Sequence, residues 1–158
     1  MTETPGTEGR NDTDWRIQQE ITIDAPVEQV WQWLAHPEKV SQWWCPPPTV
    51  AIDFEPTTGG DYTEAYRDGD DEYHLTGTIV AFDPGRRFAV RRETAGRFGP
   101  ADVVEFGLLA TDGGTRVTLV HSFVEVPDGR RAEAEEYFAP GWNWSLRELR
   151  ALVTDSAG

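Results

Sequence analysis

The apolar residues recur at every second position along most of this chain, a pattern that predicts half-buried β-strands. The first such stretch covers about residues 15–24, and the others follow a run of three prolines. Turn-forming pairs such as Gly59-Gly60 and Gly113-Gly114 separate neighbouring stretches, and connections this short join antiparallel strands. The alternation predicts strands over about residues 15–24, 49–55, 61–66, 73–82, 86–93, 102–110 and 115–124, with a Gly/Pro loop over 95–101.

Between the first and second predicted strands the apolar period changes to that of a helix. The apolar residues of 27–34 are three and four positions apart, on one face of a helix whose first turn contains Pro26. A second short helix follows His36 and Pro37. Prolines 46–48 end it, because proline lacks the backbone N–H that a helix needs.

The C-terminal part of the chain predicts one long amphipathic helix. Residues 130–138 favour helix, and Pro140 predicts a kink or a restart of the helix. Four apolar residues then recur at helical spacings: Trp142, Leu146, Leu149 and Val153. This is the only predicted helix large enough to cover one face of the sheet.

These elements predict an α+β fold with a single antiparallel sheet of about seven strands. Two short helices follow the first strand, and the long helix comes last. A chain of 158 residues suffices for one hydrophobic core. We expect one domain over residues 15–154, a disordered polar tail over 1–14 and a short tail over 155–158.

Charge narrows the range of partners. The formal net charge is −14, and Lys39 is the only lysine among 14 basic residues. Nucleic acids and anionic membranes attract basic stripes, and this chain has none, so we expect neither as a partner. With only one cysteine, no signal peptide and no membrane-spanning run, the chain is expected to be cytoplasmic. We expect the protein to be a monomer or a homodimer.

The reactive side chains offer little conventional chemistry. Cys45 lies between Trp44 and Pro46, apolar neighbours that raise the pKa of a thiol, so a small buried filler is the favoured interpretation. The alternative is that Cys45 is a nucleophile activated by a histidine that is distant in sequence but close in space. No histidine or cysteine pair has the short spacing of a zinc motif, so neither a metal nor a cofactor is expected.

His121 lies in the register of apolar Leu119 and Phe123 and is therefore predicted to face inward. One interpretation is a hydrogen-bonded core histidine, and the other is a polar group that orients a ligand or transfers a proton. Tyr62 and Tyr66 pose the same choice. Glu64, between them in register, is expected on the solvent face of a short edge strand, with an inward acid/base role as the alternative.

The arginines around the predicted strand 86–93 have two interpretations. These residues are Arg86, Arg87, Arg91 and Arg92. We expect most of them to be solvated and to balance acidic neighbours. The alternative is that one of them reaches a cavity and pairs with an anionic ligand.

Residues 20–153 resemble the helix-grip fold of the START-like, or SRPBCC, superfamily. Within it they are most similar to the branch related to the C-terminal domain of the heat-shock-protein-ninety ATPase activator. Each motif alone is weak evidence for the fold, but the set of motifs in this order is specific for it. The motifs are IDAPVEQVWQWLAHPEKVSQWW at 23–44, GGDY at 59–62, GTIVAFDPGRRFAVR at 77–91, GGTRVTLVHSF at 113–123 and GWNWSLRELRALV at 141–153.

The resemblance implies a curved sheet that wraps around the long helix, with a cavity between them. Members bind apolar or aromatic small molecules, some as carriers and others as cyclases, aromatases or hydrolases, while the co-chaperone branch contacts a chaperone. The superfamily has no common catalytic motif, so no catalytic residue is assigned.

We therefore expect a protein that binds a small apolar or aromatic molecule between sheet and helix. The alternatives are a cyclase, dehydratase or hydrolase that uses His121 with a tyrosine or Glu64 as acid/base, and a co-chaperone-like interaction protein. The expected ligand-binding residues are Trp44, Phe54, Tyr62, Tyr66, His121, Phe123, Phe138, Trp142 and Leu146.

Overall fold

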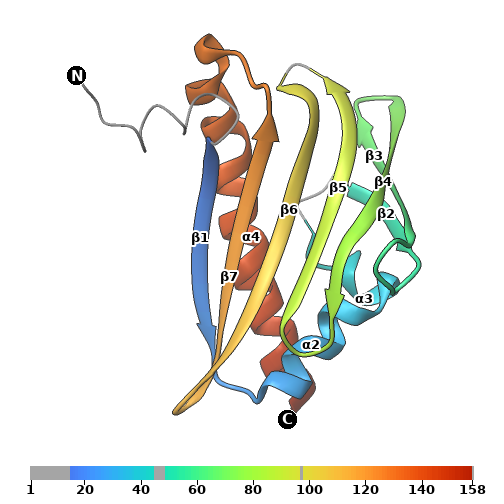
Figure 1. Cartoon of the computed structure of the whole chain (residues 1–158). Helices are drawn as coiled ribbons and strands as arrows, with labels where there is room; N and C mark the ends of the chain where they lie inside the picture. Colours follow the sequence, from blue (N-terminus) through green and yellow to red (C-terminus); the bar gives the residue numbers. More distant parts are fainter. Residues whose placement is uncertain (1–14, 45–48, 97, 158) are drawn as a thin grey trace, which may run out of the picture.

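One antiparallel sheet of seven strands, in the order β1-β7-β6-β5-β4-β3-β2, forms the framework of the protein (Figure 1). The computed structural model describes residues 15–44, 49–96 and 98–157. The strands from β2 to β7 follow one another as neighbours, and β1 completes the edge beside β7. They are β1 (Arg16–Ile23), β2 (Thr49–Phe54), β3 (Asp61–Asp68), β4 (Asp71–Asp83), β5 (Arg87–Gly96), β6 (Gly99–Thr111) and β7 (Gly114–Val124).

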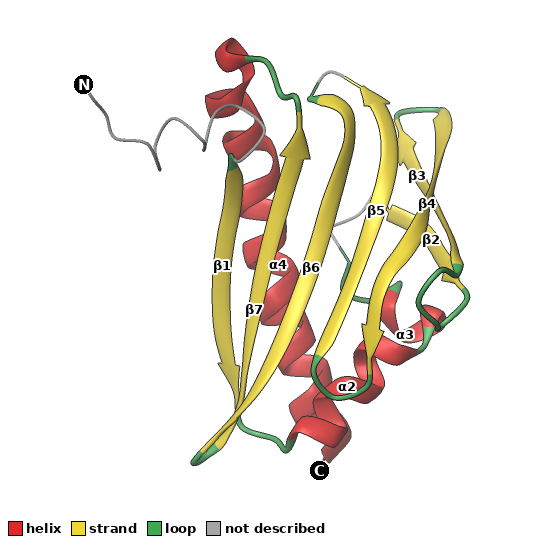
Figure 2. Cartoon of the chain, viewed as in Figure 1, coloured by secondary structure: helices red, strands yellow, loops and turns green. Residues whose placement is uncertain are grey.

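The helices cover one face of this sheet (Figure 2). The short helices α2 (Val27–Ala35) and α3 (Pro37–Val40) follow β1, and the 3-10 turn η2 (Asp128–Arg130) leads into the long helix α4 (Arg131–Ala157). The predicted fold class is thereby confirmed, with an α+β chain whose curved antiparallel sheet faces a long C-terminal helix. No helix of the described residues is long and apolar enough to cross a membrane.

The hairpin between β5 and β6 is tighter than the sequence suggested. We expected a loop over residues 95–101, but β5 extends to Gly96 and pairs with Gly99, where β6 begins. Gly99 has φ +113°, and a Cβ atom there would overlap the carbonyl oxygen of Val124. Glycine thus lets the chain turn sharply here.

Helix α4 runs through Pro140 without a restart and continues to Ala157, beyond the predicted end. Residues 155–157, expected in a tail, are therefore helical. Pro140 has no N–H to donate to the Glu136 carbonyl, so one helix bond is missing. One turn later, the Gln19 side chain on β1 donates to the Ala139 carbonyl at 3.0 Å and ties this part of α4 to the sheet. Packing of α4 against β1 compensates for part of the local cost.

The core lies between the sheet and the three helices and is rich in aromatic rings. Trp43 and Trp44, in the turn after α3, are both fully buried and contact Phe106 on β6, with ring centroids 5.2 and 5.7 Å apart. The indole N–H of Trp43 bonds to the Trp33 carbonyl at 3.0 Å. Full burial of each large side chain contributes on the order of 1.5–3 kcal/mol. These two tryptophans anchor the connection between helices and sheet.

Candidate functional site

A row of inward-facing residues crosses five neighbouring strands. Each member lies directly opposite the next in the strand register, and directly opposed residues share a face of the sheet. The row, from β3 to β7, is Tyr62, Gly77, Arg92, Asp102 and Phe123. The sheet thus places a cation beside a carboxylate in the interior of the protein.

Arg92 is the centre of a buried hydrogen-bond network. Its Nε and Nη2 atoms donate to the two oxygens of Asp102 at 2.8 and 2.7 Å, in the bidentate geometry that makes arginine–carboxylate pairs strong. Its Nη1 atom donates to Oε1 of Glu64 on β3 at 3.0 Å. The Tyr62 hydroxyl donates to the same Oε1 at 2.6 Å, so neither donor takes the second oxygen, Oε2.

The network continues from Asp102 through β7 to helix α4. Oδ2 of Asp102 lies 2.8 Å from Nε2 of His121, and Nδ1 of His121 accepts the indole N–H of Trp142 at 2.9 Å. An indole nitrogen only donates, so Nδ1 carries no proton and the hydrogen of the neutral ring is on Nε2. Six side chains therefore form one continuous chain of hydrogen bonds: Tyr62, Glu64, Arg92, Asp102, His121 and Trp142.

Gly77 gives the network its shape. It lies on β4 opposite both Tyr62 and Arg92, between the strands that carry Glu64 and Arg92. Because glycine has no side chain, the guanidinium of Arg92 can cross β4 and reach Glu64. A Cβ atom at this position would also overlap the backbone carbonyl of Arg91.

Electrostatic interactions within the network keep Arg92 and Asp102 in their charged forms. Burial alone would raise the pKa of Asp102, but the Arg92 guanidinium and His121 beside it hold that pKa well below its usual range. Burial would lower the pKa of Arg92, but Asp102 and Glu64 together raise it well above its usual value. Arg92 and Asp102 therefore form an ion pair at neutral pH.

His121 is held in its neutral form. Burial lowers the pKa of His121 below 6.5, and the neighbouring Asp102 carboxylate offsets this only in part. Protonation would also place an N–H group against the indole N–H of Trp142. With no exposed surface and both nitrogens bonded, His121 positions Asp102 and Trp142, and this geometry disfavours it as a proton-transfer group.

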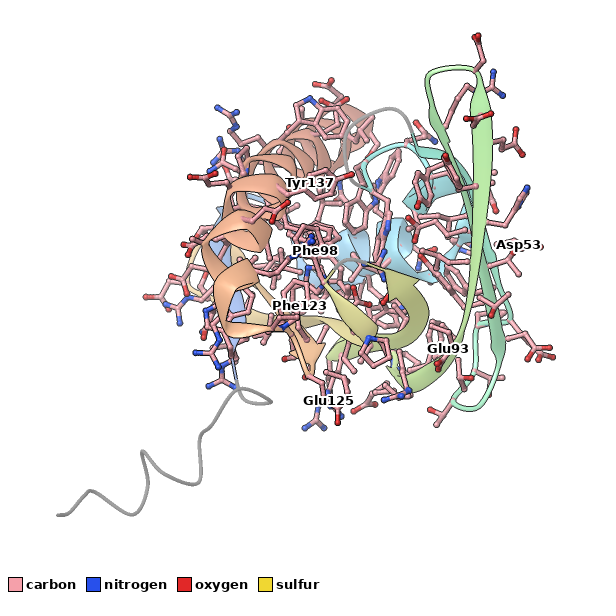
Figure 3. The ribbon with its side chains drawn as sticks, turned by 90° about the horizontal axis from the view of Figure 1, so that it is seen from above. Asp53, Glu93, Phe98, Phe123, Glu125 and Tyr137 are labelled. Carbon is pink, nitrogen blue, oxygen red and sulfur yellow. The ribbon has the colours of Figure 1, made fainter. Side chains whose placement is uncertain are left out.

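The side chains predicted to bind a ligand gather mostly in this interior. In Figure 3, Phe123 lies between α4 and the sheet, whereas Glu125 points outward. Trp44 contacts Trp142 and Tyr62, with ring centroids 5.3 and 6.3 Å apart. The predicted residues that are buried in the structure are Trp44, Phe54, Tyr62, His121, Phe123, Trp142 and Leu146. Their contact with a ligand stays a prediction.

Phe138 and Tyr66 are the partly exposed members of the predicted set. Phe138 still packs against the network, because its ring centroid lies 4.7 Å from that of His121. Tyr66 instead stacks on Tyr73 of β4, with ring centroids 5.5 Å apart. Burial, followed by the nearby Tyr137 and Glu64, raises the pKa of Tyr66. Tyr66 therefore lies at the margin of the site.

Two fully buried polar atoms in this interior lack a hydrogen-bond partner among the described residues. They are the indole nitrogen Nε1 of Trp44 and the hydroxyl oxygen Oγ of Ser145. Ser145 follows Trp142 by three positions on α4, and Trp44 packs edge-on against the Trp142 ring. Both atoms thus lie in the neighbourhood of Trp142.

The structure corrects two predictions from the sequence. Glu64 was expected on the solvent face of an edge strand, but it is 5% exposed and shares the inward face of Tyr62, two residues earlier. β3 is also not an edge strand, because β2 pairs with it. Arg92 was grouped with solvated arginines, but it is 4% exposed and balanced by two carboxylates. Arg86, Arg87 and Arg91 are exposed and pair with nearby acidic residues, as expected. Cys45 lies outside the described residues.

Asp102 was missed entirely from the sequence, although a signal existed. It shares its period-two register with Val104 and Phe106, and Arg92 shares one with Phe88 and Val90. A charge of each sign in the apolar register of two adjacent strands indicates a buried ion pair. Among the described residues, no group of three or more possible ligands is arranged to hold a metal ion.

Comparison with known proteins agrees with this architecture. Residues 24–154 match the family described as Activator of Hsp90 ATPase homolog 1-like protein. No curated protein sequence matches the chain significantly. The chain is similar to protein NE0264 from Nitrosomonas europaea, with 21% identity and a TM-score of 0.75 over 90% of this chain and 96% of that one.

Two further structures share the fold. Protein MLL2253 from Mesorhizobium loti is 24% identical, with a TM-score of 0.73 over 91% of this chain and 99% of that one. The di-domain ARO/CYC StfQ from the steffimycin biosynthetic pathway is 13% identical, with a TM-score of 0.74 over 96% of this chain and 54% of that one. At these identities the likeness establishes the fold alone.

Proposed function

This chain belongs to the family of Activator of Hsp90 ATPase homolog 1-like proteins, and on that premise we propose that it binds a small apolar or aromatic molecule between the sheet and α4. Aromatic rings such as Trp44, Phe54 and Trp142 provide the apolar contact. Glu64, held within the network by Tyr62 and Arg92, provides the polar anchor. Burial of apolar area drives the association at ~25 cal/mol per Å² before the costs of binding are subtracted.

The observation that carries this proposal is the charged network in the middle of an aromatic layer. A buried ion pair is expensive to desolvate, and well-packed apolar residues of the same volume are often at least as stabilising. Stability alone therefore does not account for Glu64, Arg92 and Asp102. Polar groups held rigidly in an apolar interior are what the recognition of a small molecule requires.

Within the network, Glu64 is best suited to contact a ligand. Arg92 directs three nitrogens to carboxylates, and both nitrogens of His121 are engaged. Glu64 uses only Oε1 for Arg92 and Tyr62, so Oε2 remains for a hydroxyl or N–H group of the ligand. Arg92 and Tyr62 then fix the orientation of this carboxylate.

Binding of the neutral probe N-phenyl-1-naphthylamine tests the proposal. We expect its fluorescence to rise saturably with the wild-type protein, because the probe has an aromatic body and one N–H donor. The E64Q variant should bind it about tenfold more weakly, the effect of one charge-assisted hydrogen bond of roughly 1.5 kcal/mol.

E135Q is the matched control, since Glu135 is exposed on α4 and the chemical change is the same. Its affinity should equal that of the wild type. Native mass spectrometry of the purified protein provides a second readout, with a co-purified small molecule as the expected result. Absence of both a bound molecule and saturable probe binding would contradict the proposal.

A further inference from the structure

The strongest unexplained feature of the interior is that Trp44 Nε1 has no hydrogen-bond partner among the described residues. The other two fully buried tryptophans are both satisfied, since Trp43 donates to the Trp33 carbonyl and Trp142 donates to His121. A buried donor without a partner costs about 1–3 kcal/mol, so such atoms are rare in folded proteins. The exception at Trp44 therefore requires an explanation.

Ser145 provides a second, independent case in the same neighbourhood. A serine or threonine in a helix commonly bonds to a carbonyl of the preceding turn. Thr154 and Ser156 on α4 do so, with bonds of 2.9 Å to the Arg150 carbonyl and 2.8 Å to the Val153 carbonyl. Ser145 is fully buried, yet its hydroxyl has no partner among the described residues. Its hydroxyl remains able to donate to another group.

Both donors belong to residues that lie beside Trp142. Residues three positions apart lie on the same face of a helix, so Ser145 lies beside Trp142. The Trp44 ring meets the same Trp142 ring edge-on, at 5.3 Å between centroids. The rings of Tyr62 and Phe106 also border the Trp44 ring, and no acceptor among the described residues bonds to Nε1.

From this geometry we infer that the bound molecule presents a hydrogen-bond acceptor oxygen of the carbonyl type to Trp44 Nε1 and Ser145 Oγ. A carbonyl oxygen has two lone pairs and can accept from both donors at once. An indole N–H cannot accept, so a ligand group that only donates leaves Trp44 unsatisfied. The inference rests on the proposed function and names the chemical class of the ligand, an aromatic ketone or a related carbonyl compound.

A matched pair of neutral probes tests the inference on the full chain: 2-acetylnaphthalene and 2-isopropenylnaphthalene. Both are planar and nearly equal in size, and they differ by C=O against C=CH₂. We expect the wild type to bind the ketone about tenfold more tightly, the effect of one to two neutral hydrogen bonds. Dissociation constants are measured by isothermal titration calorimetry.

The variants W44F and S145A locate the effect. The ratio of the two dissociation constants cancels any general change in packing, as in a double-mutant cycle. We expect this ratio to fall from about ten to about one or two in W44F, and to fall part of the way in S145A. S156A is the control, because Ser156 lies on the same helix but bonds to Val153, and its ratio should equal that of the wild type.

Each outcome has a distinct meaning. If the wild type binds both probes equally, water satisfies the two donors, and the inference is overturned while the proposed function stands. If the ratio stays near ten in both variants, the acceptor binds elsewhere and the inference is also wrong. If neither probe binds, the inference fails, and the proposed function is decided separately by N-phenyl-1-naphthylamine binding and native mass spectrometry. Should W44F not fold, as judged by circular dichroism, S145A alone still decides.

Discussion

Two parts of the same buried layer are stabilised by different interactions. Around Trp43 and Phe106 the interior is aromatic and gains stability in proportion to the area removed from water. Around Arg92 and Asp102 it is charged, and each group is tolerable only because its partner is present. The aromatic part therefore tolerates gradual changes, whereas the charged part fails when one member is removed. Two parts of a core can thus be equally buried and still differ in how much stability a substitution removes.

The largest effect is expected from R92M, which breaks the charged part at its centre. Asp102 and Glu64 would be left in the interior without their cation, and loss of one partner of a buried pair costs about 3–5 kcal/mol. Urea unfolding measures this loss of stability. R91M is the control, because Arg91 is exposed and pairs with Glu93 at the surface. Equal stability of R92M and R91M would contradict the cooperative description of the network.

A triple variant, E64Q/R92M/D102N, sharpens the same comparison. It removes all the charges together, so no buried ion is left without a partner. We expect it to be more stable than R92M alone, although it carries more substitutions. Additive losses would instead mean that the pairs contribute independently.

A smaller effect is expected from G77A, which disturbs the network without changing a charge. The added Cβ atom overlaps the Arg91 carbonyl and narrows the space through which Arg92 crosses β4. Overpacking of this kind costs about 1–3 kcal/mol. G107A on β6 is the control, because a Cβ atom there meets nothing within 4 Å. Thermal unfolding compares the two, and equal losses would mean that Gly77 has no special role.

The smallest effect is a pH dependence carried by His121. Its pKa in the folded protein is lowered, so the unfolded chain takes up the proton first as pH falls. Stability is fully present above pH 6.5, the ordinary histidine value, and decreases as pH drops from there toward the folded pKa. The slope is at most about 1.4 kcal/mol per pH unit. Urea unfolding between pH 5 and 8 measures it.

Two variants test whether His121 causes this pH dependence of stability. H121Q should abolish the change in stability between pH 5 and 6.5, since no proton is then taken up at this position. H74Q is the matched control at an exposed histidine, which pairs with Glu72 at the surface, and it should leave the contribution of His121 intact. A slope that persists in H121Q would show that another group is responsible. Asp102, whose pKa is also lowered, adds a further loss only in stronger acid.

The fold could be predicted because its signals are local. The alternation of apolar residues indicates each strand, Pro26 marks the start of α2, and the spacing from Trp142 to Val153 indicates α4. The prolines 46–48, expected to end the second short helix, lie outside the described residues, and α3 already ends at Val40. The exceptions lie where tertiary contacts override local preference. Pro140 did not end α4, which continues through it and is tied to β1 beside it by the bond from Gln19 to the Ala139 carbonyl. The 95–101 segment pairs as a hairpin despite its glycines and proline.

The candidate site was only partly predictable. The inward register of Tyr62 and His121 follows from period two, because alternation alone assigns a side chain to a face. The partners of these residues do not follow from it. Asp102 lies nineteen positions before His121, and Glu64 lies twenty-eight before Arg92, so nothing local connects them. Sequence assigned Glu64 and Arg92 to solvent because an isolated charge belongs there.

The sequence by itself determined the order of elements, the antiparallel sheet, the aromatic interior and the face on which His121 lies. These depend on periodicity, on turn residues and on the backbone restrictions of proline, which act within a few residues. Only the tertiary structure decided that β3, β5, β6, β7 and α4 bring six polar side chains together. It also decided that Trp44 Nε1 and Ser145 Oγ have no hydrogen-bond partner within the described part of the chain. The physical reason is that the cost of burying a charge depends on what surrounds it, and strand pairing sets those surroundings.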